Sequence, residues 1–172
     1  GWTVGALETG DLGARALCAG LGIRVVSVHY RLAPEHPFPA PLDDSMAVVR
    51  AMRDRSSGSI YVGGESAGAN LSAAVALLCR DEAIPLSGQF LINPAVDHRT
   101  TSASHRRLGQ GEGLTSEAVE MFFGLYAGSA NPADPRISPI FAETLAGVAP
   151  CFLVTAEFDP LIDDGAAYAR RL

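Results

Sequence analysis

The sequence predicts an α/β fold with a mostly parallel sheet and helices on both of its faces. Segments rich in β-branched and other apolar residues alternate with segments of helical periodicity, which is the pattern of parallel sheets. Apolar residues make up 48% of the 172 residues and charged residues only 19%, below the roughly 25% typical of soluble domains. This composition favours a sheet that is buried on both faces. The length indicates one domain, and no internal repeat or linker divides it.

Two helices and one strand are predicted before position 60. Leucines at helical spacing predict a helix over 9–21, which a glycine ends. A nearly unbroken run of β-branched residues predicts a strand over 23–30, buried on both faces. Four prolines then require an extended loop, in which Arg31 and Glu35 can pair. Two aspartates favour the start of the next helix, at 42–53, because carboxylates suit a helix N-terminus.

Strands and helices alternate more closely after position 60. The predicted strands are 60–63, 87–93 and 151–156, and the predicted helices are 67–80 and 118–126. A polar loop from residue 100 and a turn-rich connection over 131–139 complete the pattern. Within the later helix, Met121, Phe122, Phe123 and Tyr126 form an apolar stripe that we interpret as core packing.

Charge and cysteine content exclude several classes of partner. The formal net charge is -6, so a nucleic-acid partner is not expected. No apolar run approaches the roughly 20 residues of a membrane span, and no signal-like segment is present, which favours a cytoplasmic protein. Cys18, Cys79 and Cys151 are widely spaced in apolar surroundings. They are expected to be reduced core thiols, because no metal-ligand spacing exists among them.

The most informative stretch is 60–71, where residues 64–68 read G-E-S-A-G between a predicted strand and a predicted helix. Glycines on both sides of Ser66 allow the sharp strand-to-helix turn called a nucleophile elbow. That turn lifts the serine oxygen above the sheet edge and points the helix N-terminus at it. The amide of Ala67 then points to where an oxyanion forms during acyl transfer. We therefore expect Ser66 to be a nucleophile and Ala67 an oxyanion-hole donor.

Three further motifs accompany this one in a fixed order. They are 30–36 (Y-R-L-A-P-E-H), 134–139 (D-P-R-I-S-P) and 159–161 (D-P-L). The ordered set closely resembles the bacterial hormone-sensitive-lipase-like family of α/β-hydrolase esterases, over the whole length of the chain. The resemblance implies an α/β-hydrolase fold and a carboxylesterase acting on short- to medium-chain acyl esters of small molecules. It also implies no cofactor and no metal.

A serine hydroxyl needs a histidine to take its proton and a carboxylate to orient that histidine. In α/β-hydrolases the chain order is Ser, then Asp or Glu, then His. Asp159 follows the last predicted strand, at the edge where catalytic loops of such sheets gather, and the family motif places the acid there. Asp97, which also follows a strand, is the alternative. Asp163 and Asp164 are expected to start a terminal helix instead.

No histidine satisfies this order. His29, His36, His98 and His105 all precede Asp159. The first two are expected to be packing or loop residues and the last two to be solvated, so we assign none of them as the base.

The family carries His-Gly-Gly-Gly followed by an aromatic residue, and the chain opens with Gly1-Trp2. The resemblance therefore implies that the amide of Gly1 is a second oxyanion donor. The core sheet of this fold has about eight strands, whereas four or five are counted here. We expect residues 1–172 to be a partial α/β-hydrolase catalytic domain, truncated at both ends. It would lack the first strands and the carboxy-terminal histidine segment, and it would be inactive alone.

Three positions depart from the family pattern, and one of them is Ala69, which replaces a common glycine in the helix after Ser66. Glu65 stands where the family often has Asp, and its carboxylate is expected to hold the elbow by hydrogen bonds. Asn93 stands where an aromatic residue is frequent. Three alternatives stay open: a non-catalytic binding protein similar to the plant gibberellin receptors, a serine amidase or peptidase, and an interaction domain with a vestigial elbow. A downstream histidine would argue against the binding protein. The relative rates on matched esters and anilides distinguish an esterase from an amidase or peptidase, and labelling of Ser66 would argue against a vestigial elbow.

Overall fold

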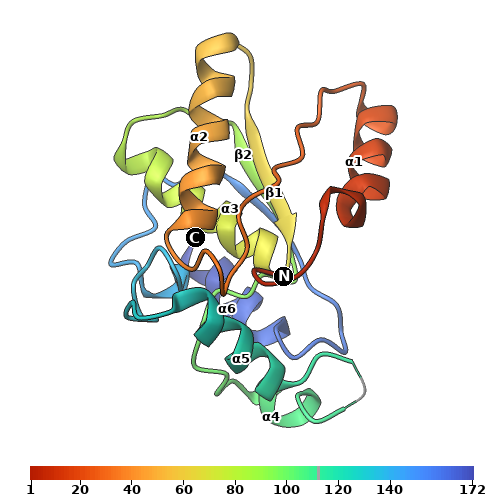
Figure 1. The fold of residues 1–172 in the computed structure, drawn as a ribbon, viewed down its shortest axis with the longest axis vertical. Coiled ribbons are helices and arrows are strands. Elements are labelled where there is room, and N and C mark those ends of the chain that lie inside the picture. Colours follow the sequence, from red (N-terminus) through yellow and green to blue (C-terminus); the bar gives the residue numbers. More distant parts are fainter. Residues whose placement is uncertain (112) are drawn as a thin grey trace.

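A computed structural model of the protein describes residues 1–111 and 113–172. The elements in chain order are α1 (Leu7–Leu21), α2 (Ala40–Arg55), β1 (Tyr61–Glu65), α3 (Ala67–Asp81), β2 (Gly88–Ile92), α4 (Ala103–Leu108), α5 (Ser116–Ala127), η1 (Pro139–Phe141), β3 (Cys151–Val154) and α6 (Ile162–Arg171). The strands form a parallel sheet in the order β1-β2-β3. Figure 1 shows α3 beside this sheet and α1 set apart from it. The predicted parallel sheet with helices is therefore present.

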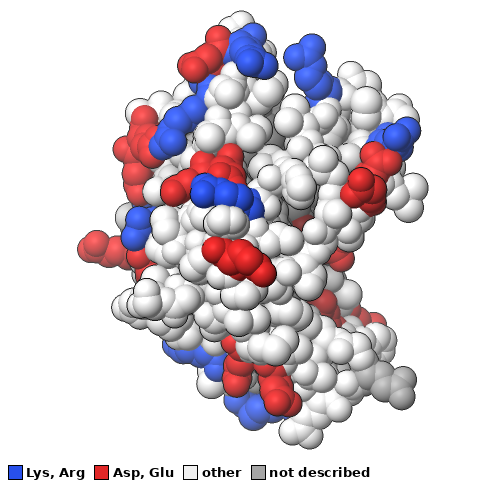
Figure 2. Space-filling view, in the orientation of Figure 1, with Lys and Arg blue, Asp and Glu red and all other residues white. Residues whose placement is uncertain are grey.

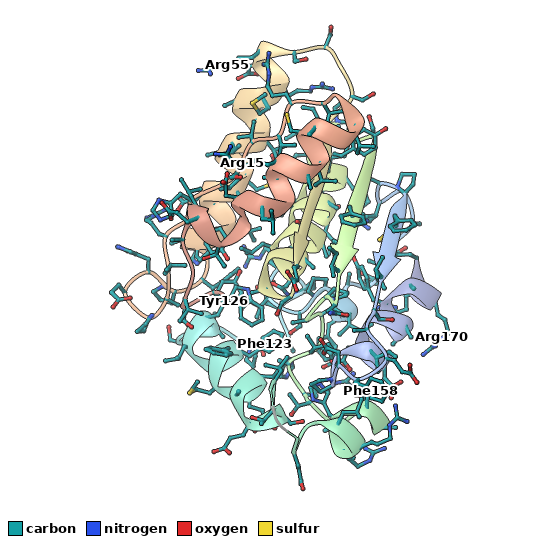
Figure 3. All side chains as sticks on the ribbon, turned by 90° about the vertical axis from the view of Figure 1, so that its right-hand side faces the viewer. Arg15, Arg55, Phe123, Tyr126, Phe158 and Arg170 are labelled. Carbon is teal, nitrogen blue, oxygen red and sulfur yellow. The ribbon has the colours of Figure 1, made fainter. Side chains whose placement is uncertain are left out.

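Helix α3 is the centre of the hydrophobic core. Its sequence is apolar on all sides, as expected for a helix surrounded by other elements, and almost every residue from Ala67 to Cys79 is buried. One side packs with α2 and α5, and the other packs with β2 and α6. From α5, Phe123 and Tyr126 reach into this core (Figure 3) and are 2% and 0% exposed, whereas Met121 is 53% exposed. The predicted apolar stripe is thus correct for Phe123 and Tyr126 and wrong for Met121.

A buried amide joins α3 to two loops. Asn70 is fully buried, and its Nδ2 donates to the carbonyl oxygens of Ala95 at 2.8 Å and Ile137 at 2.7 Å. These carbonyls belong to the loop after β2 and to the segment before η1. Because one side chain meets both, the loop that contains the 134–139 motif is fixed to the helix that starts at the elbow.

The second face of the sheet is open within the described part of the chain. The strand register places Tyr61, Phe90 and Phe152 on this face. Tyr61 is 67% exposed and Phe152 65% exposed, and the rings of Phe90 and Phe152 stack at 5.5 Å. Helix α1 buries none of its residues. The expected cover of helices on both faces is therefore not formed by these residues.

The strand expected over 23–30 is absent. Residues 22–32 form neither helix nor strand, and Ile23 and Val26 are each 46% exposed. A strand needs a neighbour that completes its ladder of hydrogen bonds, and none of the described strands lies beside this segment. A β-branched composition favours an extended backbone but cannot supply the partner. The other predicted elements form within two residues of their expected bounds, and α4 is an additional helix.

The proline-rich loop is held by an ion pair that differs from the expected one. Arg31 pairs with Asp44 on α2, with Nη2 to Oδ1 at 2.7 Å, and its main-chain N–H donates to Asp44 Oδ2 at 2.8 Å. The Arg31 hydrogen bond lowers the pKa of Asp44 below its usual value. The expected pairing of Arg31 with Glu35 is wrong, because the first turns of α2 bring Asp44 to the guanidinium.

Charges of both signs are intermixed on the face shown in Figure 2, with no large area of one sign. None of the helices described is long and apolar enough to cross a membrane.

The three cysteines have different environments, which predicts different reactivity. Cys79 is buried, Cys151 is half-buried and Cys18 is exposed on α1. The expectation of a core thiol is therefore wrong for Cys18, because none of the described residues covers it. Burial raises the pKa of Cys79 and of Cys151 to about 11.

We expect iodoacetamide at pH 8 to modify Cys18 of the native protein well before Cys79 or Cys151. The thiolate is the reactive form, and a thiol with a pKa of about 11 is ionised to roughly one part in a thousand at pH 8. At pH 10 the ionised fraction rises to roughly a tenth, so labelling of the two covered thiols should increase. Peptide mass spectrometry measures the order, and Cys18→Ser is the control. Preferential modification of Cys79 at pH 8 would contradict the assignment.

Candidate active site

Strand β1 and helix α3 meet at a single residue, Ser66. Its backbone has φ 55° and ψ -116°, a conformation that residues other than glycine rarely adopt. The Ser66 amide donates to the carbonyl oxygen of Ile92 at 2.9 Å, so the residue is still tied to β2 while α3 begins at the next position. A serine held in this strained conformation between a strand and a helix has the geometry of a nucleophile elbow.

The two glycines of the motif differ in what they allow. A Cβ on Gly64 would lie 2.4 Å from the carbonyl carbon of Gly68 and 2.9 Å from the nitrogen of Ala69. The first turn of α3 therefore packs directly on the backbone of Gly64. A Cβ on Gly68 would meet nothing within 4 Å among the described residues. The expectation that glycines on both sides of Ser66 permit the turn is correct for Gly64, and it lacks a steric basis at Gly68.

The expected oxyanion donors lie next to the elbow. Ala67 is the first residue of α3, and no side chain among the described residues caps this helix end. Its N-terminal amides and the positive end of the helix dipole can therefore act on a negative charge. At the chain start, Tyr30 Oη donates to the carbonyl oxygen of Gly1 at 3.0 Å. Figure 1 places the N-terminus beside the end of β1.

Gly1 is partly buried and lies near enough to Glu65, the residue that precedes Ser66, to interact with its charge. The Glu65 side chain is exposed and makes no hydrogen bond to the described residues, so the expected hydrogen bonds that hold the elbow are not formed there.

Asp159 lies on the loop between β3 and α6 and is half-buried. Its Oδ1 accepts a hydrogen bond from the main-chain N–H of Leu161 at 2.8 Å, whereas its Oδ2 has no partner among the described residues. Because all three strands are parallel, Ser66 and Asp159 both follow carboxyl ends of strands, at the same edge of the sheet.

The alternative acid, Asp97, is already paired. Arg99 donates to both of its oxygens, with Nε to Oδ1 at 2.9 Å and Nε to Oδ2 at 3.1 Å. Burial acts to raise the pKa of Asp97, but the Arg99 hydrogen bonds outweigh it and the net pKa lies below the usual value. Asp97 is therefore poorly suited to orient a histidine. Asp163 and Asp164 lie in the first turn of α6, as predicted.

None of the histidines bonds to Ser66 or Asp159 within the described residues. His29 and His36 are exposed, and His98 is half-buried, with Nδ1 at 3.2 Å from Ser138 Oγ. His105 is fully buried, which contradicts the prediction of a solvated residue. Helix α4 directs the imidazole of His105 into the interior, within hydrogen-bonding distance of the Asp164 carboxylate and the Ser116 hydroxyl. The sequence feature that could have predicted α4 is Ser102, because serine is a common N-cap residue and its side chain accepts a hydrogen bond from the His105 N–H at the start of this helix.

The described residues contain no group of three His, Cys, Asp or Glu side chains arranged to hold a metal ion. Two hollows of about 340 Å³ and 300 Å³ lie at the amino ends of β2 and β3, and neither is lined by Ser66 or Asp159. The edge that carries Ser66, Ala67, Gly1 and Asp159 thus supplies a strained serine, helix N-terminal amides and a carboxylate. This set suits acyl transfer once a base is present.

Comparisons with known proteins agree with this geometry. A family model described as the alpha/beta hydrolase fold matches residues 1–172. The chain is 41% identical over 186 residues to the carboxylic ester hydrolase LipN of Mycobacterium tuberculosis, covering 100% of the chain and 50% of that protein. It is 36% identical over 180 residues to an arylesterase of Saccharolobus solfataricus, covering 99% of the chain and 58% of that protein.

Solved structures give the same picture. The crystal structure of an esterase from the bacterial hormone-sensitive lipase family matches with a TM-score of 0.93 at 30% identity, covering 99% of the chain and 58% of that structure. The chain thus spans about half the length of the curated relatives it matches.

Proposed function

The chain belongs to the α/β-hydrolase family, in its hormone-sensitive-lipase-like group of esterases, and on this premise we propose that it carries the nucleophile and the acid of a serine carboxylesterase. The substrates are short- to medium-chain acyl esters of small molecules. The observation that carries the proposal is the backbone of Ser66, strained at φ 55° and ψ -116° between β1 and α3. Strain of this kind is found at functional sites, where the surrounding structure holds it in place.

The reaction proceeds in two acyl-transfer steps. Ser66 Oγ attacks the ester carbonyl carbon as its proton passes to a histidine, and the tetrahedral oxyanion is bound by the main-chain N–H groups of Ala67 and Gly1. The carbon–oxygen bond to the alcohol then breaks, and the alcohol leaves with the proton from the imidazolium. Water attacks the acyl-enzyme in the same way and releases the carboxylic acid. Asp159 orients the histidine through the oxygen that Leu161 leaves free.

The histidine belongs to the complete protein outside residues 1–172, which form a partial catalytic domain. Two observations support this assignment. None of the described histidines bonds to Ser66 or Asp159, and the chain aligns to only 50% and 58% of its two curated relatives. Residues 1–172 alone are therefore expected to lack esterase turnover.

Labelling of the complete protein with a fluorophosphonate tests the nucleophile. We expect one label per molecule, on Ser66, because an activated serine forms a covalent adduct at its oxygen. A short-chain ester should compete with labelling, and Ser66→Ala should abolish it. Labelling at a different serine would refute the assignment of Ser66 as the nucleophile. No labelling of any serine would favour a non-catalytic binding protein.

A comparison of two substrates, again with the complete protein, distinguishes an esterase from an amidase. Matched acetyl ester and acetyl anilide substrates differ only in their leaving group, so the ratio of their kcat/KM values reports the bond that the site cleaves. A carboxylesterase should strongly prefer the ester. Comparable efficiency on the anilide would identify a serine amidase instead.

A further inference from the structure

The loop over 155–161, which we call the Asp159 loop, is held at its start by the side chain of Asn93. The main-chain N–H of Ala156 donates to Asn93 Oδ1 at 2.7 Å. Asn93 directly follows β2, and its own N–H donates to the carbonyl oxygen of Val154 at 2.8 Å. The main chain of Asn93 thus binds the end of β3, and its side chain binds the start of the loop.

The same end of β2 also holds the elbow. The carbonyl oxygen of Ile92 accepts from the amide of Ser66 at 2.9 Å, and Asn93 comes next in the chain. Asn93 has φ 42°, a left-handed conformation that asparagine tolerates better than most residues. An aromatic residue at this position would be strained and would lack the acceptor oxygen. The departure from the family pattern therefore creates a contact between the end of β2, which also binds the Ser66 amide, and the Asp159 loop.

A second side chain holds the loop at its end. Ser104, at the start of α4, is fully buried and its Oγ donates to the carbonyl oxygen of Pro160 at 2.6 Å. Its main-chain N–H donates to Asp163 Oδ2 at 2.7 Å, and its Oγ accepts from the Asp163 N–H at 3.3 Å. One residue of α4 therefore fixes both the last residues of the loop and the first turn of α6.

Behind Ser104, a buried histidine joins three helices. His105 Nε2 lies 3.1 Å from Asp164 Oδ2 on α6, and its Nδ1 lies 2.8 Å from Ser116 Oγ on α5. Serine, histidine and aspartate are the residue types of a catalytic triad, but the His105 side chain is 0% exposed and that of Asp164 5%. No substrate can reach them. The group instead fixes α4 against α6, so Ser104 stays at the loop.

We propose that Asn93 and Ser104 are positioning residues, which hold the Asp159 loop so that the free carboxylate oxygen faces the catalytic histidine. The inference rests on the proposed role of Asp159 as the acid of the triad. Leu161 already fixes one oxygen of this carboxylate, so the direction of the other follows the main chain of the loop. A displacement of about 1 Å in a catalytic group can lower a rate about a hundredfold.

The test uses Asn93→Gly in the complete protein. Glycine keeps the positive φ without strain but removes the acceptor of the Ala156 N–H. We expect kcat on a p-nitrophenyl ester to fall about 10- to 100-fold with KM unchanged. Asn93→Asp, which keeps an acceptor oxygen and tolerates the same φ, should restore most of the rate. Ser104→Ala should likewise lower kcat and leave KM unchanged. Both constants are measured below the melting temperature of each variant.

The decisive measurement repeats Asn93→Gly in an Asp159→Asn background. If Asn93 acts through Asp159, the second substitution should leave kcat unchanged there. An equal loss in both backgrounds, or a wild-type kcat for Asn93→Gly alone, would overturn the inference. A wild-type kcat for Asp159→Asn would overturn the proposed acid and this inference together. An inactive Asp159→Asn beside a fully active Asn93→Gly would overturn this inference alone.

Discussion

Replacing Ser66 with alanine in the complete protein is expected to lower kcat for ester hydrolysis by about a millionfold. Without the hydroxyl, no acyl-enzyme can form, and only binding and the oxyanion donors remain to assist direct attack by water. The elbow itself should survive, because alanine removes one oxygen, and the amide that donates to Ile92 remains. Single-turnover and steady-state assays on a p-nitrophenyl ester measure the loss, and circular dichroism checks the fold.

Asp159→Asn provides the second half of this prediction. Alone it should lower kcat about ten-thousandfold, because the histidine is no longer held in the correct tautomer. Added to Ser66→Ala it should lower kcat no further, since residues of a triad act as one unit. The matched control is Asp97→Asn, which removes a carboxylate already paired with Arg99 and should leave kcat nearly unchanged. If Asp97→Asn were the damaging substitution, the acid would be Asp97.

The substitution with the largest expected effect on stability is Gly64→Ala. The new Cβ would lie 2.4 Å from the carbonyl carbon and 2.6 Å from the carbonyl oxygen of Gly68, which are main-chain atoms that cannot turn away. Helix α3 would have to move off β1, and this helix is the centre of the core. We expect the free energy of unfolding of the complete protein to fall by at least about 3 kcal/mol, the upper range for overpacking. Urea unfolding measures the change.

Gly68→Ala is the matched control within the same motif. Its added methyl group meets nothing within 4 Å among the described residues, and Gly68 lies in the first turn of a helix. Alanine favours a helix over glycine by roughly 1 kcal/mol, so stability should hold or increase. Equal destabilisation by the two substitutions would show that close packing is not what requires Gly64.

The sequence was sufficient for most helices and strands, because their own apolar patterns indicate them. The strand before Ser66, the helix after it and the two later strands follow from apolar patterns that match local geometry. The position of Asp159 at the sheet edge also followed, because parallel strands deliver their carboxyl ends to one side. The prediction of a strand over 23–30 failed although its apolar pattern is equally clear. Its composition favours an extended chain, but the hydrogen bonds of a strand come from a partner that the local sequence does not contain.

The buried polar contacts were missed because they join distant parts of the chain. His105 stands among serines and arginines, which indicated a solvated loop, yet its partner Asp164 is 59 residues away in sequence. Asn70 binds carbonyls 25 and 67 residues away, and Asn93 binds an amide 63 residues away. No periodicity marks such pairs. A polar residue inside an apolar helix, as at Asn70, was the one local signal of a buried hydrogen bond.

Asn93 and Ser104 both hold the Asp159 loop through its main chain, and this has a consequence for how the protein can evolve. Asn93 binds the amide of Ala156 and Ser104 binds the carbonyl of Pro160, so neither contact depends on which side chain the loop carries. Glu157 and Phe158 lie between them, and both are exposed, Phe158 to 79% (labelled in Figure 3). Mutation and selection can therefore vary these two exposed side chains beside Asp159 while the main chain that positions its carboxylate stays in place.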